Sequence, residues 1–215
     1  MRVLAVADEE EPALWTEAVR RHRVDLVLAA GDLPFDYLDF IAGALDRPCV
    51  LVPGNHDPDL AGYRMRRGLW TRAGLPATWP GPPGAVNADG RVVEVAGLRI
   101  AGLGGSLRYR PGPNQWTQRE QSRRARWLRL RAGRRPVDVL LTHAPPRHCG
   151  DREDRPHQGF ECLHRLVAAL RPRMLVHGHI HPHGEPVPDR RLGDTEVVNV
   201  VGHRVLEFDG VRHAA

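Results

Sequence analysis

Short runs of Val, Leu and Ala recur along the chain, and several of them end directly at a segment rich in Asp, Asn and His. Such short aliphatic runs predict strands buried on both faces, as in the sheets of α/β proteins. Ligand-binding side chains collect beyond the carboxyl ends of such strands, so these segments are expected to meet at one edge. The segments are Val6-Ala7-Asp8-Glu9-Glu10, Gly31-Asp32, Gly54-Asn55-His56-Asp57, Thr142-His143 and Gly178-His179-Ile180-His181.

The stretches between these runs predict helices, so strands and helices alternate in the way of an α/β protein. Thr117 and Glu120 have the spacing of a capping box, and Pro12 suits the first turn of a helix. Ala96-Gly97 separates two apolar stretches and predicts a hairpin, so we expect two mixed sheets with helices outside them. The predicted strands cover residues 3–7, 24–29, 49–52, 91–95, 98–101, 137–141, 174–176, 195–200 and 204–208; the predicted helices cover 12–21, 35–45, 117–131 and 160–170, and a long loop covers 63–87.

The length of 215 residues predicts a single domain, residues 1–215. Cys49, Cys149 and Cys162 are too few and too scattered for a disulfide framework or a cysteine-based zinc site, which favours a reduced, cytoplasmic compartment. No apolar run approaches the ~20 residues that a membrane span needs. Because a strand pattern begins at Met1, it leaves no room for a signal peptide. We therefore expect no membrane partner.

The charge balance is basic, with a formal net charge of +5 and a pI near 9.8. All 31 basic residues are Arg, and such complete replacement of Lys indicates a compositional bias across the whole chain. A nucleic-acid partner is therefore an alternative that the charge alone does not favour. The Arg-rich segment 117–131 is interpreted as a solvated helix face, with Trp127, Leu128 and Leu130 as its candidate core.

The mixture of Asp, Asn and His in the polar segments suits Mn, Fe or Zn better than Ca or a soft metal. A carboxylate that lies between two cations can bridge them. Two ions about 3.5–4 Å apart can then hold both the entering and the leaving oxygen of a phosphoryl displacement. A single Gly-Asp or a single His would be an ordinary turn or strand end. Five such segments at successive strand ends indicate a metal site.

The set of segments resembles the calcineurin-like metallophosphoesterase superfamily, whose pattern is D-x-H, GD, GNH-[D/E], H and G-H-x-H. The resemblance runs from Asp8 to His181. It implies a four-layer α/β/β/α sandwich of two mixed sheets flanked by helices, with a dinuclear site between the sheets. It also implies that Asp8, Asp32 and His181 hold one metal, that Asp32 bridges, and that Asn55, His143 and His179 hold the other.

The same resemblance implies the chemistry of the site. A metal-bridging hydroxide would be the nucleophile, because cations lower the pKa of bound water. His56 would act as a general acid or stabilise the charge of the transferring phosphoryl group. Asp57 would either orient His56 through its second ring nitrogen or cap the following segment. The implied cofactors are two divalent ions, with Mn favoured and Fe, Zn or Ni as alternatives.

Glu10 departs from the pattern, because it stands where the family carries a histidine. Three interpretations compete. Glu10 binds the first metal as a hard oxygen ligand, or it holds a coordinated water, or it points away and leaves that metal weakly bound. Its position just before a predicted helix also favours an acidic residue for electrostatic reasons alone.

Other residues are candidates for substrate binding. Arg108 and Arg110 follow the glycine-rich segment 102–106 and are predicted to bind a non-reacting phosphate in forked geometry. His157 is predicted to reach the rim of the site, and His183 to lie just beyond the metal ligands. Trp70 and Trp79 in the predicted long loop form either a lid or local packing.

The resulting hypothesis is a metal-dependent phosphoesterase that hydrolyses a phosphodiester or a phosphomonoester, with a small or nucleotide-like substrate favoured. Two alternatives stay open: a non-catalytic scaffold of the same fold with a weakened metal site, and a nuclease. The sequence leaves the physiological substrate and the oligomeric state undetermined.

Overall fold

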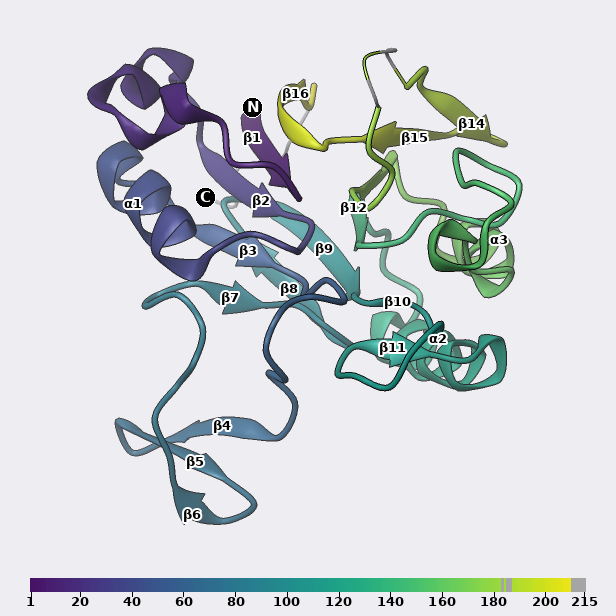
Figure 1. Cartoon of the computed structure of the whole chain (residues 1–215), viewed down its shortest axis with the longest axis horizontal. Coiled ribbons are helices and arrows are strands. Elements are labelled where there is room, and N and C mark those ends of the chain that lie inside the picture. The colour runs from purple at the N-terminus through teal and green to yellow at the C-terminus, as the bar shows by residue number, and fades with distance from the viewer. Residues whose placement is uncertain (183, 185–186, 210–215) are drawn as a thin grey trace.

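The computed structural model describes residues 1–182, 184 and 187–209, and His183 lies outside these residues. Two sheets lie face to face, with helices on their outer sides (Figure 1). The first sheet has the order β16-β1-β2-β3-β7 and the second the order β14-β15-β13-β12-β9-β8. Their strands are β1 Arg2–Ala7, β2 Leu26–Ala29, β3 Cys49–Leu51, β7 Val86–Asn87, β8 Val92–Val95, β9 Leu98–Leu103, β12 Val139–Thr142, β13 Met174–His177, β14 Arg190–Leu192, β15 Thr195–Asn199 and β16 Gly202–Glu207.

Strand alternation explains the layers. Val3, Ala5 and Ala7 of β1 pack with Val139 and Leu141 of β12 in the core between the sheets. Leu4 and Val6 of β1 point the other way, into a cluster with the segments that cover the first sheet, and Leu140 of β12 packs in the corresponding cluster of the second sheet. The predicted four-layer fold of two mixed sheets flanked by helices is confirmed. The covering segments are the 3₁₀ helices η1 Pro12–Trp15 and η2 Glu17–His22 with α1 Phe35–Leu45 on the first sheet, and α2 Gln118–Ala132 with α3 Cys162–Leu170 on the second.

Local signals account for several predicted elements. The helix predicted over 35–45 is α1, and the hairpin predicted at Ala96-Gly97 joins β8 and β9 in antiparallel register. The predicted capping box is present at the start of α2. The Thr117 hydroxyl accepts a hydrogen bond from the Glu120 N–H, and the Glu120 carboxylate accepts one from the Thr117 N–H. The two strands predicted near the carboxyl end divide between the sheets, because β15 pairs with β13 and β16 pairs with β1.

The single helix predicted over 12–21 is wrong. Thr16 has extended backbone angles (φ −129°, ψ 169°), which separate η1 from η2. Its hydroxyl accepts a hydrogen bond from the Ala18 N–H and so begins the second helix. Thr and Ser compete in this way for backbone donors, and a cap inside a helical pattern divides it.

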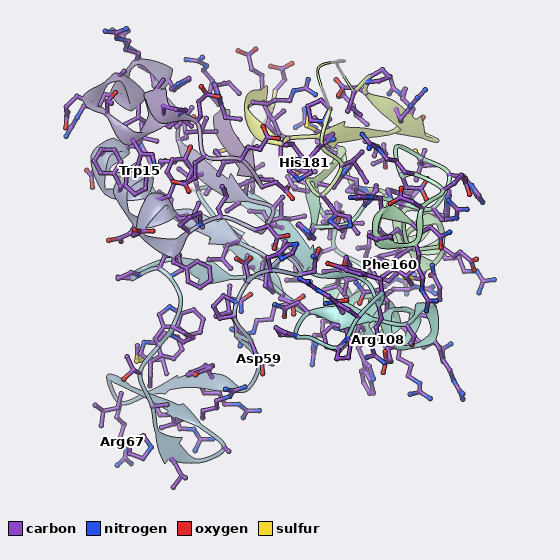
Figure 2. The ribbon with its side chains drawn as sticks, in the orientation of Figure 1. Trp15, Asp59, Arg67, Arg108, Phe160 and His181 are labelled. Carbon is purple, nitrogen blue, oxygen red and sulfur yellow. The ribbon has the colours of Figure 1, made fainter. Side chains whose placement is uncertain are left out.

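The long loop predicted over 63–87 is also wrong. β4 Tyr63–Arg66, β5 Leu69–Arg72 and β6 Leu75–Pro76 form an antiparallel sheet that extends from the body, with Arg67 at the turn between β4 and β5 (Figures 1 and 2). The turn Arg67-Gly68 has positive φ at both residues (49° and 79°), as a two-residue hairpin requires. Trp70 stacks on Trp79 with ring centroids 4.4 Å apart, so both rings take part in local packing.

The predicted core of the Arg-rich helix needs one correction. Leu128 is buried, but Trp127 and Leu130 are 62% and 65% exposed. The buried face of α2 instead repeats at Gln121, Ala125, Leu128 and Ala132, the spacing of one helix face. Among the described helices, none is both long and apolar enough to cross a membrane. The three cysteines are free and buried.

Candidate metal centre

The polar segments meet at the edge where the carboxyl ends of strands from both sheets come together. Asp8 follows β1, Asp32 follows β2, and Asn55 follows β3 in the first sheet. His143 and His179 follow β12 and β13 in the second sheet. One ligand atom from each of Asp8, Asp32, His143 and His179 lies within 4.8 Å of all the others. The structure therefore brings together residues that are far apart in the chain.

Contacts within this group are close. Nε2 of His143 lies 3.3 Å from Oδ2 of Asp32 and 3.0 Å from Oδ1 of Asn55. The rings of His143 and His179 have centroids 4.7 Å apart. Two carboxylates, an amide oxygen and two imidazoles form a mixed oxygen and nitrogen donor set, which suits a first-row transition ion. The residues present therefore fit a divalent metal.

Each buried histidine is held by a backbone carbonyl. Nδ1 of His143 donates to the Ala30 oxygen at 2.7 Å, and Nε2 of His179 donates to the Pro156 oxygen at 2.8 Å. In a neutral ring this leaves Nε2 of His143 and Nδ1 of His179 with the free lone pair. Carbonyl partners of this kind fix the tautomer and ring orientation of metal-binding histidines.

Sharp turns direct two of the candidate ligands. Asp8 and His179 have positive φ values of 61° and 69°, and each is the middle residue of a three-residue turn. The Glu9 N–H donates to the Ala7 oxygen at 2.6 Å, and the Ile180 N–H donates to the Gly178 oxygen at 2.9 Å. The His179 N–H also donates to Oδ2 of Asp8 at 2.8 Å, which locks the two turns together. Strained backbone of this type is common at functional sites.

Two glycines make room for the carboxylates. A Cβ at Gly54 would overlap Oδ1 of Asp32, and a Cβ at Gly178 would overlap Oδ2 of Asp8. The glycine before Asn55 and the glycine before His179 are therefore required by close approach of a side chain to the backbone.

Burial and charge perturb these groups strongly. Burial raises the pKa of Asp8 to about 6, although His143 and the His179 N–H oppose the rise. Burial alone would lower the pKa of His143, but Asp32 and Asp8 outweigh it and raise this pKa to about 10. Burial likewise opposes the ionisation of Asp32, but His143 and the His56 N–H hold its pKa at about 2. Buried carboxylates in this arrangement favour a cation between them.

The two glutamates that follow Asp8 have different partners in the structure. Nε2 of His181 lies 4.0 Å from Oδ1 of Asp8, and its Nδ1 lies 2.7 Å from Oε1 of Glu9. Glu10 instead accepts a hydrogen bond from the indole N–H of Trp15 at 2.6 Å. Glu10 therefore faces Trp15, and Glu9 lies against His181.

One of the two predictions for Asp57 was that it orients His56. The structure instead pairs Asp57 with backbone donors. Its Oδ2 accepts from the Gly54 N–H at 2.7 Å and the Asp32 N–H at 3.0 Å, so it joins two ligand-bearing loops. Nδ1 of His56 instead lies 3.2 Å from Nη2 of Arg110. The Tyr109 hydroxyl lies 3.4 Å from Nδ2 of Asn55.

The remaining predicted residues divide into two groups. Arg108 is held by Glu120 at 2.9 Å and by the Gln115 carbonyl, and no described contact joins it to the candidate ligands. His157 does reach the site, with its ring centroid 5.3 Å from that of His179. Sequence reasoning missed Glu9, Tyr109 and the Pro156 carbonyl. Glu9 was open to prediction from its carboxylate beside Asp8, whereas a backbone carbonyl has no sequence signal.

Residues 7–183 match the sequence model of the calcineurin-like phosphoesterase family, and the chain belongs to this family. The UPF0046 protein T07D4.2 of Caenorhabditis elegans is 32% identical over 102 residues, which cover 45% of this chain and 24% of that protein. The chain thus matches about a quarter of the length of this relative.

Solved structures show the same fold at low identity. The structure of TT1561 of Thermus thermophilus has a TM-score of 0.63 and 16% identity, covering 94% of this chain and 89% of that one. A second solved structure has a TM-score of 0.64 and 16% identity, covering 95% and 94% of the two chains. These similarities support the fold, and the family match supports the phosphoesterase class.

Proposed function

We propose that the protein is a metal-dependent phosphoesterase that hydrolyses a phosphodiester or a phosphomonoester, with a small or nucleotide-like substrate favoured. The observation that carries the proposal is the cluster of Asp8, Asp32, His143 and His179, whose ligand atoms lie within 4.8 Å of one another in a chain of the calcineurin-like phosphoesterase family. Strongly perturbed pKa values at the same residues add support, because such shifts concentrate at functional sites.

Two divalent ions are proposed, with Mn favoured and Fe, Zn or Ni as alternatives. Asp8, Asp32 and His181 would hold one ion, and Asp32, Asn55, His143 and His179 the other. Divalent ions at such a site supply activation of water and neutralisation of phosphoryl charge. Asp32 is suited to serve both ions, because its ligand atom lies within 4.8 Å of those of Asp8, His143 and His179.

His56 is proposed to stabilise the charge of the transferring phosphoryl group by donating a hydrogen bond. The Arg110 guanidinium donates to its Nδ1, which therefore accepts, so a neutral His56 ring carries its proton on Nε2. His56 is exposed, unlike the buried Asn55 beside it, and a substrate can reach it. An Nε2–H there can donate to the leaving oxygen or to a phosphoryl oxygen. Arg110 acts as a positioning residue in this scheme.

Hydrolysis of bis(p-nitrophenyl) phosphate and p-nitrophenyl phosphate with added Mn, Fe, Ni or Zn tests the proposal. We expect turnover that chelation abolishes and that His56→Ala lowers by about 10²-fold or more, the usual cost of losing one hydrogen-bond donor that stabilises transition-state charge. His22→Ala, on η2, is the matched control and is expected to retain activity. Background rates with every metal, together with no effect of His56→Ala, would favour a non-catalytic scaffold.

A nuclease is the second alternative, and it predicts cleavage of single-stranded DNA or RNA at rates above those for the small esters. Its binding would weaken steeply with salt, because each phosphate contact releases counterions. Salt-independent turnover of the small esters and no strand cleavage would support the small-substrate proposal.

A further inference from the structure

We propose that the cavity beside the candidate metal centre binds a second phosphate, carried by the leaving group of the substrate. The cavity has a volume of about 510 Å³, within the range of small-ligand sites, and is lined by Arg108, Tyr109, Arg110, Pro111, Gly112 and Arg155. The substrate class is then a phosphate ester or anhydride whose leaving group is itself phosphorylated. The inference has two halves. The catalytic half, that the phosphate belongs to the leaving group, rests on the proposed function. The binding half, that the cavity binds a phosphate, does not depend on it.

The cavity adjoins the centre on two sides. On one side, Arg110 contacts His56 at 3.2 Å and Tyr109 contacts Asn55 at 3.4 Å. On the other side, Arg155 begins η3 Arg155–His157. The Pro156 carbonyl of η3 accepts from His179, and the ring of His157 lies beside that of His179. Tyr109 and Arg110 thus contact the candidate metal centre directly, and Arg155 adjoins it through the two residues that follow it in η3.

The cavity carries uncompensated positive charge. Arg108 is paired with Glu120 at 2.9 Å. Within residues 1–182, 184 and 187–209, no ion pair joins Arg110 or Arg155 to an acidic side chain. Arg124, by contrast, is bound by both carboxylate oxygens of Asp89 at 2.6 Å. Two guanidinium groups free of carboxylates offer several N–H donors each, in the fork that matches phosphate.

The geometry at His56 places this phosphate on the leaving-group side. Nδ1 of His56 faces Arg110, so Nε2 lies at the opposite edge of the ring. An oxygen of the leaving group that accepts a hydrogen bond from the Nε2–H has Arg110 on the far side of the same ring. The rest of the leaving group can then extend past His56 into the cavity, where a phosphate finds Arg110 and Arg155. An uncharged leaving group would offer neither guanidinium group an anionic partner.

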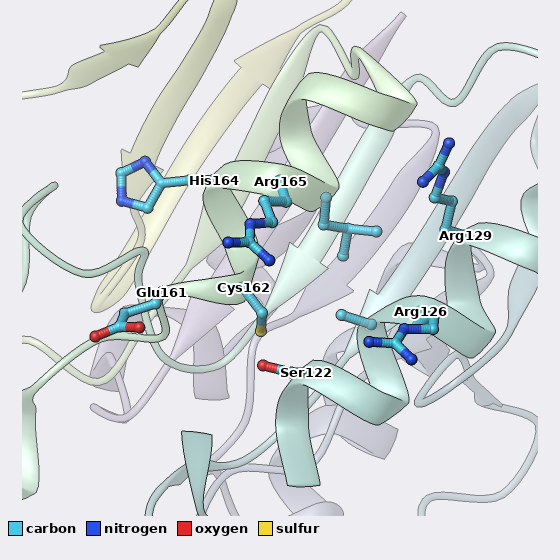
Figure 3. A pocket seen from close by; sticks show the side chains of 9 residues that line it. Ser122, Arg126, Arg129, Glu161, Cys162, His164 and Arg165 are labelled. Carbon is cyan, nitrogen blue, oxygen red and sulfur yellow. The ribbon is translucent and has the colours of Figure 1, made fainter. Parts of the chain in front are cut away.

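A second arginine-lined cavity provides an internal control. It lies between α2 and α3, with a volume of about 390 Å³, and Arg126, Arg129 and Arg165 line it (Figure 3). None of the described contacts joins its lining residues to a candidate ligand. Arg126→Gln therefore removes an exposed guanidinium from a comparable cavity that has no part in the proposed site.

A selectivity experiment tests the catalytic half. Inorganic tripolyphosphate serves as a substrate with a phosphorylated leaving group, and p-nitrophenyl phosphate as one without it, at a fixed concentration of free metal. The ratio of their kcat/KM values is expected to fall about tenfold or more in Arg155→Gln, since a charge-assisted hydrogen bond is lost. Arg126→Gln is expected to leave the ratio unchanged. An unchanged ratio in Arg155→Gln would overturn the assignment to the leaving group.

Calorimetric titration of metal-free protein with tripolyphosphate tests the binding half without any turnover. Arg155→Gln is expected to raise the Kd about tenfold or more, Arg155→Lys by less because it keeps the charge without the fork, and Arg126→Gln not at all. Equal Kd values for the wild type and Arg155→Gln would overturn the phosphate site. If the wild type hydrolyses neither substrate but the Kd pattern holds, the proposed function fails and the phosphate site stands.

Discussion

The two ends of the candidate metal centre contain the same kinds of side chain, but they are held in different ways. At one end, His143 is fully buried and His179 nearly so, and backbone carbonyls of Ala30 and Pro156 fix their rings. At the other end, the side chain of His181 is 38% exposed, and its ring is held by the exposed carboxylate of Glu9. Glu10, at the position of the family's histidine, contacts Trp15.

We infer from this difference that the restraint on each ring, as well as its ligand chemistry, distinguishes the two ends. A ring held by a buried carbonyl cannot reorient without breaking a buried hydrogen bond. A ring held by an exposed carboxylate has a weaker restraint, because exposed ion pairs contribute little. We therefore expect tight metal binding at the His143 end and weaker binding at the His181 end.

Asp32→Asn is predicted to have the largest effect, because Asp32 is the proposed shared ligand of the two ions. The substitution keeps the shape and removes the charge that both proposed ions need. Turnover of bis(p-nitrophenyl) phosphate is expected to fall by more than about 100-fold, the upper range for indirect partners of a metal. Elemental analysis should show loss of metal from both ends. Retention of one full equivalent would break the assignment of Asp32 as a shared ligand.

Glu9→Gln sharpens the comparison, because it alters only the His181 end. A carboxylate that orients a metal-binding histidine is typically worth about 10–100-fold in metal affinity. We expect a loss of this size for the weaker ion only, measured by calorimetric titration with Mn. Glu10→Gln is the matched control and should leave both affinities unchanged. The opposite pattern would restore Glu10 as the ligand.

Gly178→Ala tests the close packing at the same end. The added Cβ would overlap the carboxylate of Asp8, and overpacking of this kind lowers the free energy of unfolding by about 1–3 kcal/mol. Thermal unfolding of the metal-free protein measures it. Gly43→Ala, in α1 with open space around the added Cβ, should instead be neutral or stabilising. Equal melting temperatures for Gly178→Ala and the wild type would contradict the observed packing.

Per pH unit, the change in metal affinity is expected to be the smallest of these effects. The raised pKa of His143, about 10, keeps its ring protonated at pH 7 in the metal-free protein, and a metal requires the neutral ring. Metal binding should therefore release a proton from His143, and affinity at this end should rise with pH by up to about tenfold per unit. Calorimetry in buffers of different ionisation enthalpy counts the proton. Binding at the His143 end without proton release would contradict the prediction.

Much of this centre was predictable because strand ends are predictable. Asp32 and His143 each follow a short aliphatic run, and the carboxyl ends of such runs converge in an α/β sandwich. The capping box at Thr117 and the hairpin at Ala96-Gly97 were likewise encoded by local residues. In each case a short stretch of sequence carries its own physical signal.

The remaining features depend on contacts between distant segments. The turn around Asp8 decides which glutamate faces His181, and it is locked by the N–H of His179. Asp57 has two backbone donors as partners, and one of them comes from the loop after β2. Arg110 reaches His56 only because the segment after β10 Ser106–Leu107 lies over the loop after β3. No local pattern encodes these pairings.

Titration of metal-free protein with Mn, with elemental analysis of the product, tests the central claim most directly. Two sites of unequal affinity are predicted, with the tighter one lost in Asn55→Ala and the weaker one lost in His181→Ala. A single class of site that is unaffected by His181→Ala, or equal affinities at both ends, would contradict the account.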